Sequence, residues 1–378
     1  MPNKIVYIGY YCEQSYFTHL IEKDKKRYSQ ARQNLEYSLL EGLKEQGEID
    51  VISYVPYSAT MSCPSETILD QIRIINICVE DNLPGVIKGA LSIFRILGKK
   101  ENGTKILMYA VNPMFVIPAI LLRRKKRFEL CTICSELPQY RRWKEKLKNR
   151  IKHGIQAFLN RRFDKYILLA EKMKDVIPVK RKPYMVMEGI YSGTLTIKTD
   201  FPQTKAVMYA GGLSEDNGIK HIINGFKVSN ADELWVCGGG PLEEYVRTEA
   251  QNNCRIKYLG MVSVDEVRRL EREAFLLVCV RDNKNPLTMY SFPSKILEYL
   301  ASGTRVAVSK LDGVPQEYYE YVETINDYDF TSIKECINRT VLLNENEYQV
   351  VSQKQITFVQ NNKCPAFQGK RVYDFILK

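Results

Sequence analysis

The strongest constraint on the fold is an alternation of short β-branched or aromatic runs with longer segments of helical spacing. Strands that alternate with helices predict βα units and a parallel sheet. The expected strands cover residues 5–8, 50–54, 105–110, 128–134 and 165–170, and then 206–210, 234–237, 256–259, 276–280 and 305–309. The pattern therefore predicts an α/β protein.

The chain length predicts more than one domain. At 378 residues the chain exceeds the roughly 250 to 300 residues at which a single core stops growing. Residues 180–202 combine proline and glycine turns with little periodicity, which is typical of a linker. We expect one Rossmann-like domain at 1–182, a second at 183–360, and a helix at 361–378 that could pack back on the first domain.

Several features bear on the compartment and on cofactors. The N-terminus lacks the pattern of a secretory signal, and no apolar run approaches the roughly 18 residues that span a bilayer, so we expect a cytoplasmic protein. Cys131 and Cys134 form a lone CxxC. With three histidines in the chain, buried structural thiols are favoured over a zinc site. No cofactor or metal is expected.

Three glycine turns follow expected strands, at Gly9, at Gly211 and Gly212, and at 238–240, which includes Gly239. Glycine lets a backbone approach a ligand closely, and the next helix offers unpaired N–H groups to a phosphate. The alternative for each is a tight turn without a ligand. The first turn lacks GxGxxG, so NAD chemistry is not indicated.

The most specific segment covers residues 281–318. Pro293 and Ser294 are typical of a helix start, which places Lys295 in the first turn and Glu298 one turn inside. A lysine there opposes the helix dipole unless an anion lies nearby. Arg281 ends a strand at the edge where open α/β sheets bind ligands. A phosphate explains both cations, whereas solvated surface side chains are the simpler alternative.

Residues 206–318 resemble the donor-binding domain of the glycosyl transferases group 1 family, also called glycosyltransferase family 4. The matching motifs are YAGGLSEDNGI, LWVCGGGPLEEYV, RIKYLGMVSVDEV and FPSKILEYLASG, in the order of the family. The resemblance implies the GT-B fold, with two Rossmann-like domains facing across a cleft. It also implies a retaining, metal-independent sugar transfer from a nucleotide-sugar.

By this resemblance, Glu298 is the second glutamate of the E-x7-E motif and binds the nucleotide ribose. The first glutamate is replaced by Tyr290, and the cations common in the loop after the first strand are replaced by Gly212 and Asn217. We infer that Arg281 and Lys295 supply the positive charge, and that Ser294 and the N–H groups near Phe292 complete a phosphate cradle. The residues assigned to donor binding are Gly9, Gly211, Gly212, Gly239, Arg281, Tyr290, Phe292, Ser294, Lys295 and Glu298.

Candidates for catalysis at the acceptor lie in the first half. His19 follows the first glycine turn, and Glu136 follows an expected strand, where it could act as a base or orient a hydroxyl. Structural roles for both are the alternative. Asp327 and Asp329 form a nominal DxD in a polar turn after the motifs, which is a weak metal signal.

The positive charge is concentrated in residues 123–165. This segment holds fifteen Lys and Arg against four acids, a net charge of +11, the same as that of the whole chain. It includes a lysine-rich helix with apolar residues near one face, which could lie on an anionic membrane or pack on the first domain. Nucleic-acid binding is less favoured because no recognition module is present.

The sequence thus predicts a retaining glycosyltransferase, cytoplasmic or peripheral at the inner face of a bacterial membrane. Its donor would be a UDP-sugar, and its acceptor a polysaccharide or lipid-linked oligosaccharide in capsule or exopolysaccharide synthesis. A nucleotide-sugar epimerase of the same fold and a non-catalytic scaffold protein are the alternatives.

Overall fold

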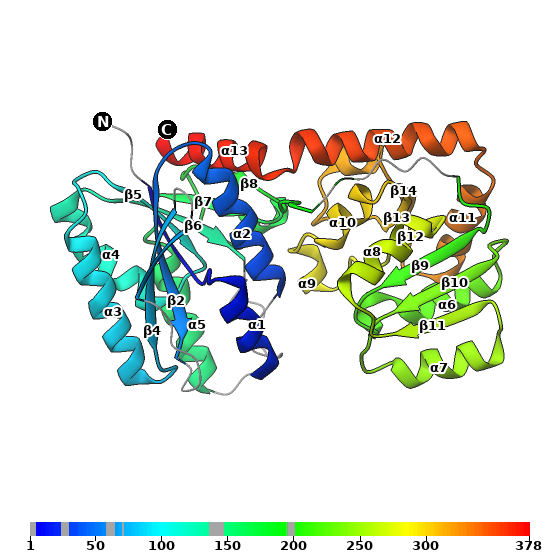
Figure 1. The fold of residues 1–378 in the computed structure, drawn as a ribbon, viewed down its shortest axis with the longest axis horizontal. Coiled ribbons are helices and arrows are strands. Elements are labelled where there is room, and N and C mark those ends of the chain that lie inside the picture. Colours follow the sequence, from blue (N-terminus) through cyan, green and yellow to red (C-terminus); the bar gives the residue numbers. More distant parts are fainter. Residues whose placement is uncertain are drawn as a thin grey trace. The chain divides into compact units, whose positions relative to one another are not determined.

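The computed structural model describes residues 5–23, 30–57, 65–69, 72–135, 147–193, 195 and 201–378. The chain divides into two compact units (Figure 1). Unit 1 comprises residues 1–169, 173–190 and 364–378, and unit 2 comprises residues 170–172 and 191–363. The expected boundary at 182/183 falls earlier than this one, because residues 184–186 form a strand of the first sheet.

Unit 1 contains an eight-stranded sheet of order β3-β4-β2-β1-β5-β6-β7-β8, in which only β3 is antiparallel to its neighbour. Every residue of β1 is buried, as expected for a parallel strand covered on both faces. Its strands are β1 (Ile5–Gly9), β2 (Ile49–Pro56), β3 (Glu66–Leu69), β4 (Ile72–Val79), β5 (Lys105–Tyr109), β6 (Glu129–Cys134), β7 (Lys165–Leu168) and β8 (Tyr184–Val186).

The helices of unit 1 cover this sheet on both faces. They are α1 (Gln14–Lys23), α2 (Gln30–Lys44), α3 (Leu83–Gly98), α4 (Pro113–Lys126), α5 (Leu147–Asn160) and the C-terminal α13 (Pro365–Leu377). Crossovers between parallel strands are right-handed. The sheet order therefore places α3, α4 and α5, which lead toward β7, on the opposite face from α2.

The C-terminal helix α13 packs on α2 within unit 1. The contact depends on two glycines. A Cβ on Gly42 would lie 1.9 Å from the Pro365 carbonyl oxygen, and one on Gly369 would lie 2.2 Å from the Gly42 carbonyl carbon. The buried Lys165 Nζ also donates to the Ile376 carbonyl oxygen at 2.9 Å. The end of the chain thus belongs to the unit that contains its beginning.

Unit 2 contains a six-stranded parallel sheet of order β11-β10-β9-β12-β13-β14. Two buried apolar clusters cover its faces. Its strands are β9 (Ala206–Ala210), β10 (Glu233–Cys237), β11 (Ile256–Gly260), β12 (Leu276–Cys279), β13 (Arg305–Ser309) and β14 (Glu323–Ile325). Its helices are α6 (Ile219–Lys227), α7 (Glu243–Asn252), α8 (Val264–Glu273), α9 (Pro286–Met289), α10 (Lys295–Ala301), α11 (Phe330–Val341) and α12 (Glu345–Asn362).

The expectation of two Rossmann-like α/β domains is therefore confirmed. The chain enters unit 2 beside the point where it leaves, since Tyr191 N donates to the Lys363 carbonyl oxygen at 2.8 Å. No helix in the described ranges has both the length and the apolar character to cross a membrane.

Candidate functional site

In unit 2 the order of the strands reverses between β9 and β12. Crossovers lead from β9 through β10 to β11 on one side, and from β12 to β13 and β14 on the other. Helices leave such a switch point in opposite directions, so the carboxyl ends of the two central strands open a crevice where ligands bind. Gly211 and Gly212 follow β9 and Arg281 follows β12. The sheet therefore brings these predicted residues to one place.

The glycine turns after β9 and β10 are packed backbone to backbone. Gly211 N donates to the Cys237 carbonyl oxygen at 2.9 Å, and Leu213 N donates to the Gly239 carbonyl oxygen at 3.0 Å. Gly238 has φ +129, and a Cβ there would lie 1.9 Å from the Gly211 carbonyl oxygen. The packing demands glycine at Gly238. Gly239 has a less restrictive position, since its Cβ would come no closer than 3.4 Å to another atom.

Lys295 lies against the turn after β9. A Cβ on Gly211 would be 3.1 Å from Lys295 Cε, so the lysine stem occupies the space beside the glycine. The Lys295 charge opposes the burial-driven rise in the pKa of Cys237 and Cys279, which end β10 and β12. The ammonium group therefore acts on the carboxyl edge of the sheet.

Arg281 is the second cation at this edge. It is half-buried, and its backbone N donates to Ser309 Oγ at 3.2 Å. Its charge opposes the rise in the pKa of Tyr209 that burial causes, and the Tyr209 hydroxyl donates to the Gly212 carbonyl oxygen at 2.8 Å. Within the described part of the chain, neither Arg281 nor Lys295 forms an ion pair with a carboxylate. Two cations without an ion-pair partner among the described residues thus lie at the carboxyl edge of this sheet.

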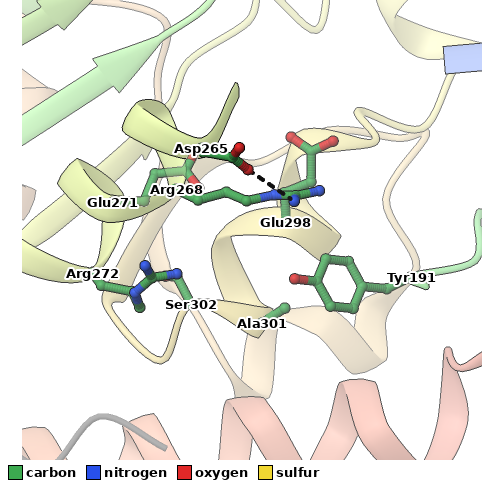
Figure 2. Close-up of a pocket in the computed structure, with 8 residues that line it drawn as sticks. All are labelled: Tyr191, Asp265, Arg268, Glu271, Arg272, Glu298, Ala301 and Ser302. Atoms are coloured by element: carbon green, nitrogen blue, oxygen red, sulfur yellow. Dashed lines mark ion pairs between the residues drawn. The ribbon is translucent and has the colours of Figure 1, made fainter. Parts of the chain in front are cut away.

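Glu298 lines a pocket of about 200 Å³ in unit 2 (Figure 2). Helix α8 supplies much of its wall, and Arg268 pairs there with Asp265 at 3.8 Å. The hydroxyl of Tyr191 points into the pocket (Figure 2). The lining residues are Tyr191, Asp265, Arg268, Glu271, Arg272, Glu298, Ala301 and Ser302.

Glu271 is the unexpected member of this pocket. Its residue is 3% exposed, and its pKa is raised to about 7, first by burial and then by the charge of Glu298. Lys295, Arg268 and Arg272 act in the opposite direction. Lys295 and Glu298 both act on the Glu271 carboxyl. The candidate for phosphate binding, Lys295, therefore lies close to the candidate for ribose binding, Glu298. Sequence reasoning did not identify Glu271, because this residue lies within a run of charged residues on α8.

The other residues assigned to donor binding have varied surroundings in unit 2. Tyr290 ends the short helix α9 and is half-buried. Phe292 is partly buried and packs against an apolar core cluster, with its ring tilted 52° to that of Tyr318 and 5.0 Å between the ring centroids. Ser294 precedes α10, is exposed, and caps it with no side-chain hydrogen bond. Gly303 follows the C-cap of α10, Ser302, and has φ +72.

Gly9 belongs to unit 1, and its surroundings differ from the expected phosphate contact. A Cβ there would lie 2.3 Å from Glu36 Oε2. That oxygen accepts from the Tyr7 hydroxyl at 2.7 Å and from Tyr10 N at 2.8 Å. Burial raises the pKa of Glu36 to about 7. The glycine makes room for a buried carboxyl group and not for a ligand.

A second pocket of about 200 Å³ lies at the carboxyl edge of the first sheet. The Arg32 guanidinium stacks 4.5 Å from the centre of the Tyr10 ring, and Asn112 Nδ2 donates to the Tyr10 hydroxyl at 2.9 Å. The lining residues are Tyr10, Cys12, Phe17, Leu20, Arg32, Tyr54, Pro56, Asp81 and Asn112. Sequence reasoning named none of them, because they come together only when β1, β2, β4 and β5 align.

Of the two catalytic candidates, the structure describes only His19. His19 lies on α1 beside Tyr16, with 6.5 Å between the ring centroids, and does not line the cavity. Glu136 lies outside the described residues.

The metal signals have structural explanations where the chain is described. Asp329 Oδ1 accepts from Ser332 N at 2.8 Å and so caps α11. Cys131 and Cys134 are buried, and burial raises the pKa of both thiols. Over the described ranges, no group of three or more His, Cys, Asp or Glu side chains is placed to hold a metal ion.

Two α/β units of this topology, one with cations at its switch point, define the GT-B class of fold. Solved structures with this fold match nearly the whole chain. A trehalose-phosphate synthase (UDP-forming) from Burkholderia vietnamiensis has a TM-score of 0.67 at 11% identity and covers 99% of this chain and 100% of its own. Sucrose-phosphate synthase from Thermosynechococcus elongatus has a TM-score of 0.66 at 14% identity, with 99% of each chain covered. HepE from Anabaena, solved with UDP, has a TM-score of 0.63 at 12% identity, with 99% of each chain covered.

The family model of glycosyl transferases group 1 matches residues 204–338, which lie within unit 2. The matched residues include the motifs that carry the resemblance to this family, and the solved structures share the GT-B fold. No curated protein sequence matches it.

The raised pKa of Glu271 predicts a pH dependence of stability. In the unfolded chain this carboxyl ionises near 4.5, and in the folded chain near 7. Between these values the folded state holds the extra proton, so stability falls as pH rises and levels off above about 7. A Glu271→Gln variant has no carboxyl group to ionise here, so it does not lose this stability as the pH rises. Relative to the wild type it should gain about 3 kcal/mol between pH 4 and pH 8.

Urea unfolding at several pH values measures this difference. Glu244→Gln is the matched control, because the Glu244 side chain is 91% exposed. A constant difference between Glu271→Gln and the wild type across this pH range would show that Glu271 is not held as described.

Proposed function

We propose that the protein transfers a sugar from a nucleotide-sugar, in the simplest case a UDP-sugar, to a glycan acceptor with retention of anomeric configuration. The observation that carries the proposal is that Lys295 lies beside Gly211 and that Arg281 follows β12 at the same edge of the sheet, where its charge acts on Tyr209. Two cations without carboxylate partners, next to exposed backbone at a switch point, suit a diphosphate. The UDP in the structure of HepE supports this choice of donor.

The leaving diphosphate carries negative charge that must be stabilised as the glycosidic bond breaks. Lys295 and Arg281 can supply this stabilisation as fixed charges, which is why we propose that the transfer needs no metal ion. Glu298 would accept hydrogen bonds from the ribose hydroxyls. Tyr290, Ser294 and the Gly239 backbone remain candidates for further donor contacts, whereas Phe292 would act by packing.

The acceptor would bind in the pocket of unit 1. Tyr10 and Tyr54 offer aromatic faces, and Asn112 offers an amide, which together suit a sugar ring with its hydroxyls. His19 and Glu136 remain proposed for acceptor orientation or proton transfer. We propose a polysaccharide or lipid-linked oligosaccharide as the acceptor, in the synthesis of a capsule, exopolysaccharide or other bacterial surface glycan. The basic segment 123–165 supports a peripheral site at the inner membrane face.

Donor binding should depend on the two cations. We predict that Lys295→Ala and Arg281→Ala each weaken UDP binding about 10- to 100-fold, because each removes a charge-assisted hydrogen bond to the diphosphate. Isothermal titration calorimetry measures this effect. Lys354→Ala is the matched control, since Lys354 is an exposed lysine on α12. Equal affinity in all four proteins would remove the diphosphate from this turn.

The reaction itself has a separate test. With a panel of UDP-, GDP- and ADP-sugars, we predict that one donor is consumed and that NMR of the product shows the anomeric configuration of the donor. EDTA should leave the rate unchanged, because the cations replace a metal. A product of inverted configuration would contradict the proposed retention. A rate that EDTA abolishes and only a divalent ion restores would contradict the proposed independence of metal ions. Interconversion of the donor without an acceptor would instead identify an epimerase.

A further inference from the structure

Helix α3 is apolar on both of its faces. Its inner face is buried through Gly85, Gly89, Ile93 and Leu97. The outer face should be polar in a helix that meets only water. Instead it carries large apolar side chains at helical spacing, with exposed fractions of 73%, 52%, 52% and 38%. These are Leu83, Ile87, Leu91 and Phe94.

The neighbouring helices continue this surface. Helix α4 packs along α3, and α5 packs on α4 (Figure 1). Ile117 and Leu121 on α4 are 44% and 67% exposed, and Ile155 and Phe158 on α5 are 46% and 54% exposed. We call this surface the α3–α4–α5 face, defined by Leu83, Ile87, Leu91, Phe94, Ile117, Leu121, Ile155 and Phe158. Eight large exposed apolar side chains on three helices that pack in succession indicate an interaction site.

The charged side chains of α3 and α4 are all basic, although one of them, Arg123, pairs with Asp164 beyond the end of α5. Helices α3 and α4 contain six cations, Lys88, Arg95 and those at 123–126, and no Asp or Glu. On α5 and just after it, Arg162 lies 4.6 Å from the centre of the Phe158 ring. The acidic residues nearest to α3 in the sequence, Glu80 and Asp81, precede the first turn of this helix.

We propose that the α3–α4–α5 face docks on an anionic lipid bilayer, with the apolar side chains inserted and the cations at the headgroups. Aliphatic side chains surrounded by Lys and Arg are typical of helices that lie in a membrane interface. This assignment extends the basic segment to α3, which lies outside it. It deepens the proposed function, because a lipid-linked acceptor would lie in the same bilayer.

Other occupants fit this face less well. In a two-fold dimer this basic face of one copy would contact the same basic face of the second copy, and the repulsion between like charges is unfavourable. A nucleic acid would find phosphate partners, but six of the eight apolar side chains are aliphatic and offer no ring on which bases can stack; Phe94 and Phe158 are the exceptions. The bilayer satisfies both the apolar and the basic character.

Co-sedimentation of the full chain with vesicles tests this proposal. The probes are phosphatidylcholine vesicles with and without phosphatidylglycerol. We expect about tenfold stronger binding to the anionic vesicles, and a loss of about tenfold in Ile87→Asn/Leu91→Asn. A several-fold loss is expected in Lys88→Gln/Arg95→Gln, with a weaker salt dependence. Leu342→Asn/Val350→Asn is the matched control, since these side chains on unit 2 are 80% and 54% exposed.

The outcomes distinguish a failure of the docking proposal from a failure of the proposed sugar transfer. UDP binding in unit 2 should be unchanged in the Ile87→Asn/Leu91→Asn variant, and its far-UV circular dichroism should match that of the wild type, which shows that unit 1 is folded. Vesicle binding equal to that of the wild type in this variant would overturn the proposal. So would a wild-type dimer that the variant abolishes, because the face would then belong to a second copy. Vesicle binding without any UDP binding would leave the docking face intact and remove the proposed transfer.

Discussion

The proposed donor site depends on the close approach of two glycine turns in unit 2. Gly211 and Gly238 pack backbone to backbone after β9 and β10, and a side chain on Gly238 would collide with the Gly211 carbonyl group. The absence of a Cβ on Gly211 also leaves the space that the Lys295 stem fills. This packing sets the position of the ammonium group at the switch point, where Arg281 arrives from β12. These contacts support the proposal of a charge-stabilised diphosphate site at this turn.

The two units use the same topology for different purposes. In unit 2 the turn after the first strand is flanked by cations, whereas in unit 1 the equivalent turn at Gly9 is filled by the buried carboxyl of Glu36. Burial keeps the pKa of this carboxyl near 7, and its hydrogen bonds hold Tyr10 at the rim of the unit 1 pocket. A negative group behind that turn does not suit a phosphate, but aromatic and amide side chains at its edge suit a sugar.

The sequence predicts the fold well because strands such as β9, β10, β12 and β13 are short apolar runs bounded by turns. It does not predict β8, a three-residue strand next to Pro183 that exists only by pairing with β7. The motifs bring Lys295, Arg281 and the Gly211 turn together, but pattern alone cannot find Glu271, whose burial depends on the packing around α8. Nor can it separate the inner and outer faces of α3, because apolar residues occupy both.

The most direct test of the account is a crystal structure of the protein with UDP bound. The account predicts that the diphosphate lies at the Gly211–Gly212 turn, within hydrogen-bonding distance of Lys295 Nζ and the Arg281 guanidinium, with the ribose hydroxyls on Glu298. A nucleotide bound elsewhere in unit 2, with these two cations still in solvent, would contradict the central claim that they form the donor site.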